Sequence, residues 1–599
     1  MNNTLFSRRN LQFLLNEVIK IEEICSYDYF SDHDRDTFEM ILDTADQIAR
    51  NQLHPYFSEM DKKPPVFKNG RVEVHPMVRE WMTQAGEGGW IAASFSYEIG
   101  GQQLPVTIRT ATSFMFSAAN YSAAVYPVLT TGAAGLIATF GSEKLQQTYL
   151  PTMFAGKWQG TMALTEPQAG SSLADIRTRA IPTETDHYLI KGEKIFISAG
   201  DHDGVDNIVN LVLAKIEGAP AGVKGISLFV VPRLRPTEDG LIYNDVTTSG
   251  TFHKMGYKGA PITHLSFGDN GDCHGYLVGE AHHGLTYMFR MMNETRLEVG
   301  NAAAAIASAS YYNALNYAQE RLQGRRASAK DLLQPMVPII EHADIKRMLL
   351  FQRAIVEGSL SLLLQCSKYA DLCQVEQEEQ KEHYELLLDL LTPIAKSYPS
   401  EMGIQSTSYG LQIHGGYGYC DEYPQEQLYR DIRIHPIHEG TTTIQGIDLL
   451  GRKVQMQKGI AFPLFVAQVE KAIEDANQDQ DLSPYAERLK GGLTALIEVT
   501  DRLVGTSAVD PELILADSAL YLELFGLVAI AWQWLLQGTT AQRALQTDPS
   551  ERETSFYQGK ILTLRYFFHY ELSKYHGLAL RLGERDGLTV RSGVEDFED

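Results

Sequence analysis

The first quarter of the chain carries apolar residues at helical spacing. Between residues 36 and 51 they recur three or four positions apart, which predicts an amphipathic helix. The run 107–121 is rich in alanine, serine and methionine, and it predicts a second helix packed closely against a ligand or another helix. A turn-rich stretch lies between them at 64–76. Residues 1–155 are therefore predicted to form an N-terminal helical domain.

The periodicity changes between residues 156 and 280. Short segments rich in β-branched residues, separated by turn residues, predict strands. No helices of ordinary length alternate with them, so the pattern favours a β-sandwich or barrel over a doubly wound Rossmann sheet. Lys191-Gly192 is placed where a hairpin turn would fall. The predicted strands are 160–166, 187–198, 207–216, 225–233 and 263–269.

Helical spacing returns at residue 281 and continues to the end of the chain. Residues 281–455 are predicted to form a four-helix bundle, and residues 460–599 an additional helical extension. The chain is therefore assigned to the α+β class, with helices and strands in separate domains. The most apolar run, Leu524–Leu536, is shorter than the ~20 residues that span a bilayer, so it predicts a buried helix and no membrane span.

Charge and cysteine content narrow the possible functions. The net charge of −23 disfavours a nucleic-acid partner, because nucleic-acid-binding proteins carry a basic surface. The five cysteines are scattered and form no CxxC pair, so neither a metal site nor a redox dithiol is predicted. The N-terminal stretch lacks the features of a signal peptide, and a cytoplasmic location is expected.

Three stretches combine glycine, hydroxyl groups and acidic residues in ways that chemistry could use. Residues 162–172 end a predicted strand in a small-residue turn, which suits anion binding or an ordinary strand end. Residues 412–419 contain paired glycines, which suit either close approach of the backbone to another group or a helix C-terminus. Residues 434–445 place Glu439 beside a glycine and three threonines, as a base or as a solvated acid. The residues alone leave these alternatives open.

Together with three further motifs, these stretches resemble the acyl-CoA dehydrogenase family. The resemblance runs from about residue 40 to 453, with six motifs in the family's order. The additional C-terminal helices resemble the larger bacterial subgroup, which includes 3-methylmercaptopropionyl-CoA dehydrogenases and some long-chain enzymes. The motifs are Leu164–Ser171, Phe196–Ser198, Asn293–Arg296, Glu320–Arg325, Gln412–Gly418 and Glu439–Thr441.

The resemblance implies a non-covalently bound FAD. Phe196 would pack on the flavin ring, while Arg321 and Gln323 would reach the FAD phosphates of a neighbouring subunit, which implies a homodimer or a tetramer. An electron-transfer flavoprotein is the implied redox partner. The residues implied to contact FAD are Leu164, Thr165, Ser171, Phe196, Ser198, Arg321, Gln323, Gln412, Gly415, Gly416, Thr441 and Thr443.

The resemblance also implies the reaction, the oxidation of an acyl-CoA thioester to the trans-2-enoyl-CoA, as in fatty acid β-oxidation. Glu439 would take the α-proton while the β-hydrogen leaves as hydride to flavin N5. Some relatives carry the base just before the position of Arg296, but that residue is Thr295 here. His438 replaces the aromatic residue usual before the base, so the family's substrate rules do not transfer directly. The residues implied to line the substrate site are Ser171, Asn293, Arg296 and Gly440.

Two alternatives keep the same fold. An acyl-CoA oxidase would pass the electrons to oxygen, and the sequence does not separate it from a dehydrogenase. A non-dehydrogenating flavin relative, such as a monooxygenase or a DNA-damage-associated homologue, would tend to lack the Glu-Gly-Thr motif that is present at Glu439–Thr441.

Overall fold

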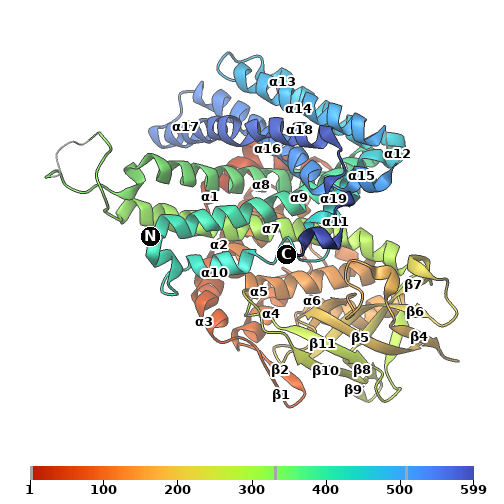
Figure 1. Ribbon diagram of the computed structural model, residues 1–599. Coiled ribbons are helices and arrows are strands. Elements are labelled where there is room, and N and C mark those ends of the chain that lie inside the picture. The colour runs from red at the N-terminus through yellow and green to blue at the C-terminus, as the bar shows by residue number, and fades with distance from the viewer. Residues whose placement is uncertain (1–4, 329–332, 506–509) are drawn as a thin grey trace. The chain divides into compact units, whose positions relative to one another are not determined.

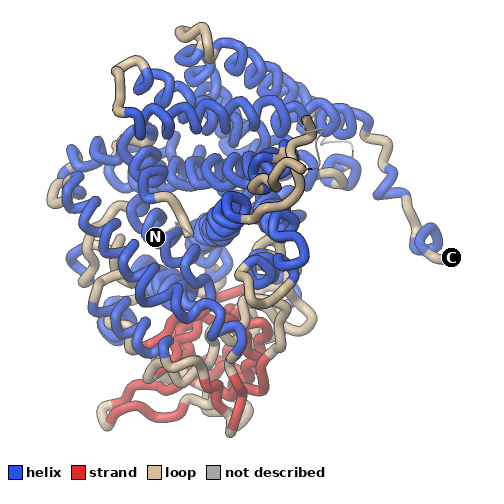
Figure 2. The backbone as a smooth tube through the Cα atoms, turned by 90° about the vertical axis from the view of Figure 1, so that its left-hand side faces the viewer, coloured by secondary structure: helices blue, strands red, loops and turns tan. Residues whose placement is uncertain are grey.

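The computed structural model describes residues 5–328, 333–505 and 510–599, and the chain divides into two compact units. One unit is Asp36–Thr295, and the other joins Met1–Arg35 to Arg296–Asp599. Every strand among the described residues belongs to the first unit, and these strands are the red segments of Figure 2. This segregation of helices and strands confirms the predicted α+β class.

The unit Asp36–Thr295 begins with helices. The longest of them, α5, contains a kink at Asn120, where the backbone leaves the helical conformation. The Asn120 side chain accepts a hydrogen bond from the N–H of Ala123 (3.2 Å) and so starts the second half of the helix. In Figure 1, α5 and α6 lie beside the strands of the same unit. The helices are α2 (Arg35–Ile48), α3 (Phe57–Lys62), α4 (Met77–Glu87), α5 (Val106–Phe140) and α6 (Glu143–Phe154).

The turn-rich stretch at 64–76 folds as a small hairpin. Its strands, β1 (Val66–Lys68) and β2 (Arg71–Glu73), pair antiparallel across Asn69-Gly70. Both turn residues have positive φ, a conformation that asparagine and glycine adopt readily in two-residue hairpin loops.

Eight strands form the β domain. Five of them close a ring, because β12 joins β5 to β7, β6 follows β7, and β4 pairs with both β6 and β5. This closure agrees with the barrel alternative. The predicted strand 207–216 matches β6, whose first eight residues are buried. The strands are β3 (Trp158–Ala163), β4 (Arg179–Pro182), β5 (Tyr188–Ser198), β6 (Asn207–Ile216), β7 (Ile226–Pro232), β10 (Val246–Thr251), β11 (Ile262–Phe267) and β12 (His274–Leu277), with a separate hairpin of β8 (Leu234–Thr237) and β9 (Gly240–Tyr243).

The hairpin turn expected at Lys191-Gly192 is wrong. Strand β5 continues through both residues, and Gly192 pairs with Phe267 of β11. The glycine is needed for close packing instead, because a side chain at this position would overlap Thr178. The continuous strand carries Lys194 and Phe196, which both bear on the site described below.

The unit Met1–Arg35 with Arg296–Asp599 contains the bundle. Its long helices α8 and α9 lie side by side in Figure 1. Buried alanines on α7, Ala302–Ala305, permit close packing of this helix against its neighbours. The elements are α7 (Gly284–Glu320), α8 (Ala343–Val375), α9 (Glu378–His414), the short turn η10 (Gly415–Tyr419), α10 (Gln425–Ile432) and α11 (Thr442–Gly451).

The C-terminal helices belong to the same unit as the bundle. The apolar run Leu524–Leu536 lies in α16, and most of its side chains are buried, as predicted. The N-terminal segment also joins this unit, since Arg9 pairs with Glu553 of α17 at 2.6 Å. The elements are α1 (Arg8–Gln12), η11 (Lys453–Gln455), α12 (Met456–Gly459), α13 (Ala461–Ala476), α14 (Ser483–Val504), α15 (Pro511–Leu515), α16 (Ser518–Leu545), α17 (Glu551–Tyr566), α18 (Tyr575–Glu584) and α19 (Leu588–Arg591).

Three helices of the described residues are long and apolar enough, by length and composition alone, to cross a membrane: α5, α8 and α16. In α8 and α16, 83% and 78% of the most apolar window is buried inside the protein, and in α5 the share is 56%. Their apolar residues are thus largely accounted for by packing within the fold.

Candidate active site

The predicted cofactor turn at Leu164–Ser171 is held by a buried carboxylate. Glu166 accepts hydrogen bonds from the backbone N–H groups of Arg177 (2.6 Å) and Thr178 (3.0 Å), and from the Thr178 hydroxyl (2.6 Å). Its own N–H and carbonyl pair with those of Ala169 at 3.0 Å. The carboxylate of Glu166 therefore points into the protein and fixes the turn.

Lys194 of β5 supplies the opposite charge. Its Nζ lies 2.8 Å from Glu166 Oε1 and donates to the carbonyl oxygen of Leu164 at 2.9 Å, and both charged side chains are buried. Burial opposes ionisation of Glu166, but the Lys194 ammonium and the hydrogen bonds from Thr178 and Arg177 outweigh it and hold the pKa of Glu166 at about 2. The turn is thus anchored by a buried ion pair.

An exposed aromatic side chain stands next to this turn. Phe196 is 57% exposed, has a φ of +57° and lies with its ring centroid 4.6 Å from that of Phe252. The turn runs alongside it, because Ile195 N–H donates to the Thr165 carbonyl at 2.9 Å. Thr165 and Ser198 are half-buried. Exposed aromatic surface beside hydroxyl groups fits a flat heteroaromatic ring with polar edges, so these residues fit the flavin ring of FAD.

The remaining predicted contacts of this unit are accessible. Ser171 is exposed and Asn293 is half-buried. Glu294, the neighbouring acid, has a side chain that is 65% exposed and lies 3.6 Å from Arg109.

Glu439 lies on the loop between α10 and α11, and its side chain is exposed. The next residue, Gly440, has a φ of +73°, and a side chain there would overlap the amide of Gln445. Thr441 precedes the first residue of α11, and Thr443 is exposed in its first turn. The glycine therefore allows a sharp turn directly after the carboxylate.

Three polar side chains hold this loop. Lys396 of α9 donates to the carbonyl oxygens of His438 (3.1 Å) and Gly440 (2.7 Å). Gln445 Nε2 donates to the same Gly440 carbonyl at 3.2 Å. The hydroxyl of Thr442 donates to Glu401 at 2.6 Å. The backbone on both sides of Glu439 is thus tied to α9 and α11.

Arg296 belongs to the same polar cluster. It is buried, and its Nη1 lies 3.6 Å from Asp448 Oδ2. Burial lowers the pKa of the Arg296 guanidinium, and the carboxylates of Asp448 and Glu439 oppose this. The ideal position of a side chain at Gly440 falls 3.5 Å from Arg296 Nε. Arg296, Glu439 and Gly440, which the sequence assigns to base and substrate contacts, are therefore neighbours.

A third group lies where α7 and α9 end. The guanidinium of Arg321 lies 5.8 Å from the ring centroid of Tyr417, in the turn that follows Gly415 and Gly416. Among the described residues, apart from the glycines' own neighbours in the chain, no atom lies within 4 Å of a side-chain position at either glycine, so the backbone there is open to a ligand or a partner. Gln412 is exposed on the last turn of α9. Gln323, also exposed, donates its N–H to the Val337 carbonyl at 3.0 Å.

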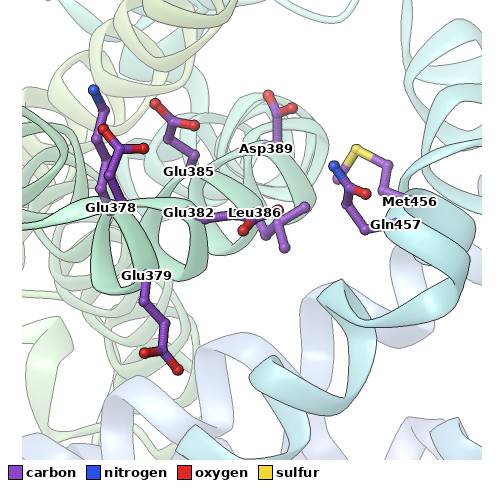
Figure 3. Close-up of a pocket in the computed structure, with 9 residues that line it drawn as sticks. Glu378, Glu379, Glu382, Glu385, Leu386, Asp389, Met456 and Gln457 are labelled. Atoms are coloured by element: carbon purple, nitrogen blue, oxygen red, sulfur yellow. The ribbon is translucent and has the colours of Figure 1, made fainter.

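One pocket of this unit does not suit an anionic ligand. It has a volume of about 770 Å³ and lies between the first half of α9 and the residues Met456 and Gln457 (Figure 3). Acyl-CoA and FAD both carry phosphate groups, which acidic side chains repel. The acidic residues lining the pocket are Glu378, Glu379, Glu382, Glu385 and Asp389.

The sequence motifs did not identify Lys194 or Lys396, which hold the two candidate loops. The sequence feature that could have identified them is a charged residue at a position that the pattern of apolar residues places in the protein interior. Lys396 follows Ile394 and Ala395 in α9, and all three side chains are buried. A buried lysine needs a partner, so its position alone predicts a polar contact.

Four family models match successive parts of the chain. They are the acyl-CoA dehydrogenase N-terminal domain at residues 35–157, its middle domain at 161–270, its C-terminal domain at 282–454, and the acetyl-CoA dehydrogenase C-terminal-like domain at 465–591.

Curated relatives agree with these models over nearly the whole chain. A 3-methylmercaptopropionyl-CoA dehydrogenase of Ruegeria pomeroyi is 35% identical over 93% of this chain and 94% of its own length. A butyryl-CoA dehydrogenase of Syntrophomonas wolfei is 33% identical over 94% of both chains. The broad-specificity linear acyl-CoA dehydrogenase FadE5 of Mycobacterium tuberculosis is 32% identical over 93% of this chain and 94% of its own. The chain belongs to the acyl-CoA dehydrogenase family and is an enzyme of that class.

Solved structures share the fold. An acyl-CoA dehydrogenase from Bacillus anthracis, complexed with FAD, has a TM-score of 0.74 at 22% identity and covers 98% of this chain and 93% of its own. Caenorhabditis elegans ACDH-11, in complex with C11-CoA, has a TM-score of 0.75 at 18% identity and covers 99% and 97%. At this identity the likeness establishes the architecture, including the C-terminal extension.

Proposed function

We propose that the protein binds FAD and oxidises an acyl-CoA thioester to the trans-2-enoyl-CoA, with Glu439 as the base. One observation carries this proposal: Glu439 is an exposed carboxylate on a loop whose backbone is tied down on both sides. A general base must be accessible to its proton and held in place, and this carboxylate is both. Arg296 and Gly440 lie beside it, as the sequence motifs imply.

Each unit carries some of the residues proposed to contact FAD. In Asp36–Thr295, Phe196 would pack on the flavin ring, while Leu164, Thr165 and Ser198 would line its edge. The contacts in the other unit would come from Arg321, Gln323, Gln412, Gly415, Gly416, Thr441 and Thr443. When bound, FAD supplies an acceptor for the hydride that leaves the substrate β-carbon.

The chain's own residues would carry the proton chemistry. A carboxylate oxygen of Glu439 takes the proton from the α-carbon, and the electrons of that C–H bond form the new double bond. The backbone N–H of Glu439 donates to the thioester oxygen, where negative charge develops as the α-proton leaves. Ser171 and Asn293 would contact the acyl-CoA.

The substrate is proposed only as a class. The relatives named above act, by their names, on 3-methylmercaptopropionyl-CoA, butyryl-CoA and linear acyl-CoAs. A panel of these thioesters, mixed anaerobically with the enzyme while flavin bleaching is followed, would rank the chain lengths. Reoxidation assayed with oxygen and with an electron-transfer flavoprotein would separate an oxidase from the proposed dehydrogenase. We expect the flavoprotein to be the acceptor, and the enzyme to be a cytoplasmic homo-oligomer.

Replacing Glu439 with glutamine tests the base. The amide keeps the size of the side chain but is far too weak a base to take the α-proton, so Glu439→Gln should slow anaerobic flavin reduction at least ~10²-fold. FAD content and acyl-CoA binding should change little. Glu294→Gln is the matched control, because Glu294 lies only two positions before Arg296 in the sequence but is placed against Arg109. It should retain most of the activity. Near wild-type reduction by Glu439→Gln, with loss of activity in Glu294→Gln, would reverse the assignment.

A further inference from the structure

A buried lysine lies directly against the backbone around Glu439. Lys396 is fully buried on α9, and its Nζ donates to the carbonyls of His438 at 3.1 Å and Gly440 at 2.7 Å. These are the residues immediately before and after Glu439. One ammonium group therefore holds both ends of the short backbone segment that carries the carboxylate.

Packing does not explain a lysine at this position. Desolvating an ammonium group is unfavourable, and an apolar side chain would fill a helix interior without that cost. Burial lowers the pKa of Lys396 to about 7, and the neighbouring charge of Arg296 acts in the same direction, while the carboxylates of Glu401 and Glu439 oppose it. Lys396 therefore has acidic and basic groups around it on α7, on α9 and in the Glu439 loop.

The shape of the loop depends on the same contacts. The carbonyl of Gly440 accepts from both Lys396 and Gln445, so the positive φ of this glycine is held from two sides. The ring of His435, four residues before Glu439, is also buried. Burial lowers the pKa of this imidazole to about 4, and the positive charge of Lys396 acts in the same direction. Lys396 thus lies at the centre of the contacts that support Glu439.

We propose that Lys396 is a positioning residue for the reaction: it fixes the backbone on both sides of Glu439 and keeps a positive group beside the carboxylate. This inference rests on the proposed role of Glu439 as the base. Since a displacement of the base by about 1 Å can cost ~10²-fold in rate, loss of both hydrogen bonds should slow the chemical step by about that factor.

Two substitutions separate the hydrogen bonds from the charge. Lys396→Met removes both, whereas Lys396→Gln keeps an N–H donor without the charge. We expect flavin reduction to slow ~10²-fold in Lys396→Met and less in Lys396→Gln, with little change in the acyl-CoA concentration for half-maximal rate. In both variants the acid limb of the pH–rate profile should move to higher pH, because loss of a neighbouring cation disfavours an ionised carboxylate. A purely structural lysine would not move that limb.

Lys453→Met is the matched control. Lys453 is also a buried lysine of this unit, but it pairs with Asp389 at 3.0 Å. The control should reduce flavin within about threefold of wild type, with an unshifted profile, as expected of a side chain outside the site. FAD content and thermal midpoint are measured for every variant. If Lys396→Met does not fold, the same two measurements, the rate of flavin reduction and the acid limb of the pH–rate profile, are made on Lys396→Gln.

The outcomes distinguish this inference from the proposed function. If Glu439→Gln reduces flavin at nearly the wild-type rate, the base assignment fails and the role of Lys396 fails with it. If Glu439→Gln is inactive while folded Lys396 variants keep the wild-type rate and acid limb, only the positioning role is overturned. Slower reduction with a shifted limb, in protein that retains FAD, supports it.

Discussion

Replacing Lys194 with methionine would leave the carboxylate of Glu166 without its counter-ion inside the β domain. The two groups are 2.8 Å apart and both are buried. Removing one partner of a buried ion pair typically costs about 3–5 kcal/mol, because an uncompensated charge remains. The Leu164 carbonyl would lose its donor in the same substitution. Lys194→Met should therefore destabilise the β domain and loosen the predicted cofactor turn.

The pKa of Glu166 provides a second estimate. It lies at about 2 in the folded protein against an ordinary value of 4.5, because the Lys194 charge and the hydrogen bonds to the carboxylate outweigh burial. Because the pKa of Glu166 is lower in the folded than in the unfolded protein, the ionised group stabilises the fold by about 3 kcal/mol at pH values above 4.5. This stability is lost as the pH falls from about 4.5 toward 2. This value covers the whole hydrogen-bonding network of Glu166, and it agrees with the expected cost of removing Lys194.

Urea unfolding followed by circular dichroism, with flavin fluorescence reporting release of FAD, measures both effects. Lys194→Met should lower the free energy of unfolding by about 3–5 kcal/mol and release FAD at lower urea. The double variant Glu166→Gln with Lys194→Met should recover much of the loss, because a neutral amide needs no counter-ion. Lys191→Met, an exposed lysine on the same strand, is the control and should shift stability by less than about 0.5 kcal/mol. An unchanged transition in Lys194→Met would refute the anchoring role.

Two further results are expected. Burial lowers the pKa of His202 to about 3 and that of His435 to about 4, so the unfolded chain gains protons below pH 6.5 that the folded protein does not; each histidine should cost about 2 kcal/mol of stability at pH 5 relative to neutral pH. His202→Phe keeps a ring against Tyr126 and should remove about half of the stability that the two histidines together cost at pH 5. Unfolding compared at the two pH values measures this, and an unchanged difference would exclude His202 as a source. Arg321→Ala should weaken FAD binding about tenfold, as for a charge-assisted contact, while the exposed neighbour Arg326→Ala should not. If Arg321→Ala and the wild-type protein bind FAD with equal affinity, Arg321 does not contact the cofactor. If the wild-type protein saturated with FAD sediments as a monomer, Arg321 does not act across a subunit interface.

The elements that the sequence predicted well are those with continuous patterns. Strands β6 and β7 are predominantly apolar in sequence because nearly every residue is buried. The short strands β4, β9 and β12 were not predicted, since they are only four residues long and mostly exposed or half-buried. Four residues with little apolar character do not establish a period of two.

The site follows the same division. Glu439 and Gly440 could be predicted because they belong to one short motif. The role of each residue there depends mainly on residues next to it in the sequence. Lys194 and Lys396 contact groups 28 to 44 positions away, so their roles depend on tertiary pairing. Sequence periodicity shows that such a lysine falls on an interior face, but it does not show which carbonyl or carboxylate it meets.

The C-terminal extension supports both elements that hold the Glu439 loop. In α16, Gly526 lies against Tyr398 of α9, two residues from Lys396, and Ser518 lies against Gly446 of α11, next to Gln445. At each contact a glycine leaves no room for a side chain, so the helices approach closely. Lys396 and Gln445 both donate to the Gly440 carbonyl, and the distance between their helices therefore sets the shape of the loop. Because α16 packs on both α9 and α11, we expect it to keep the distance between these two helices constant.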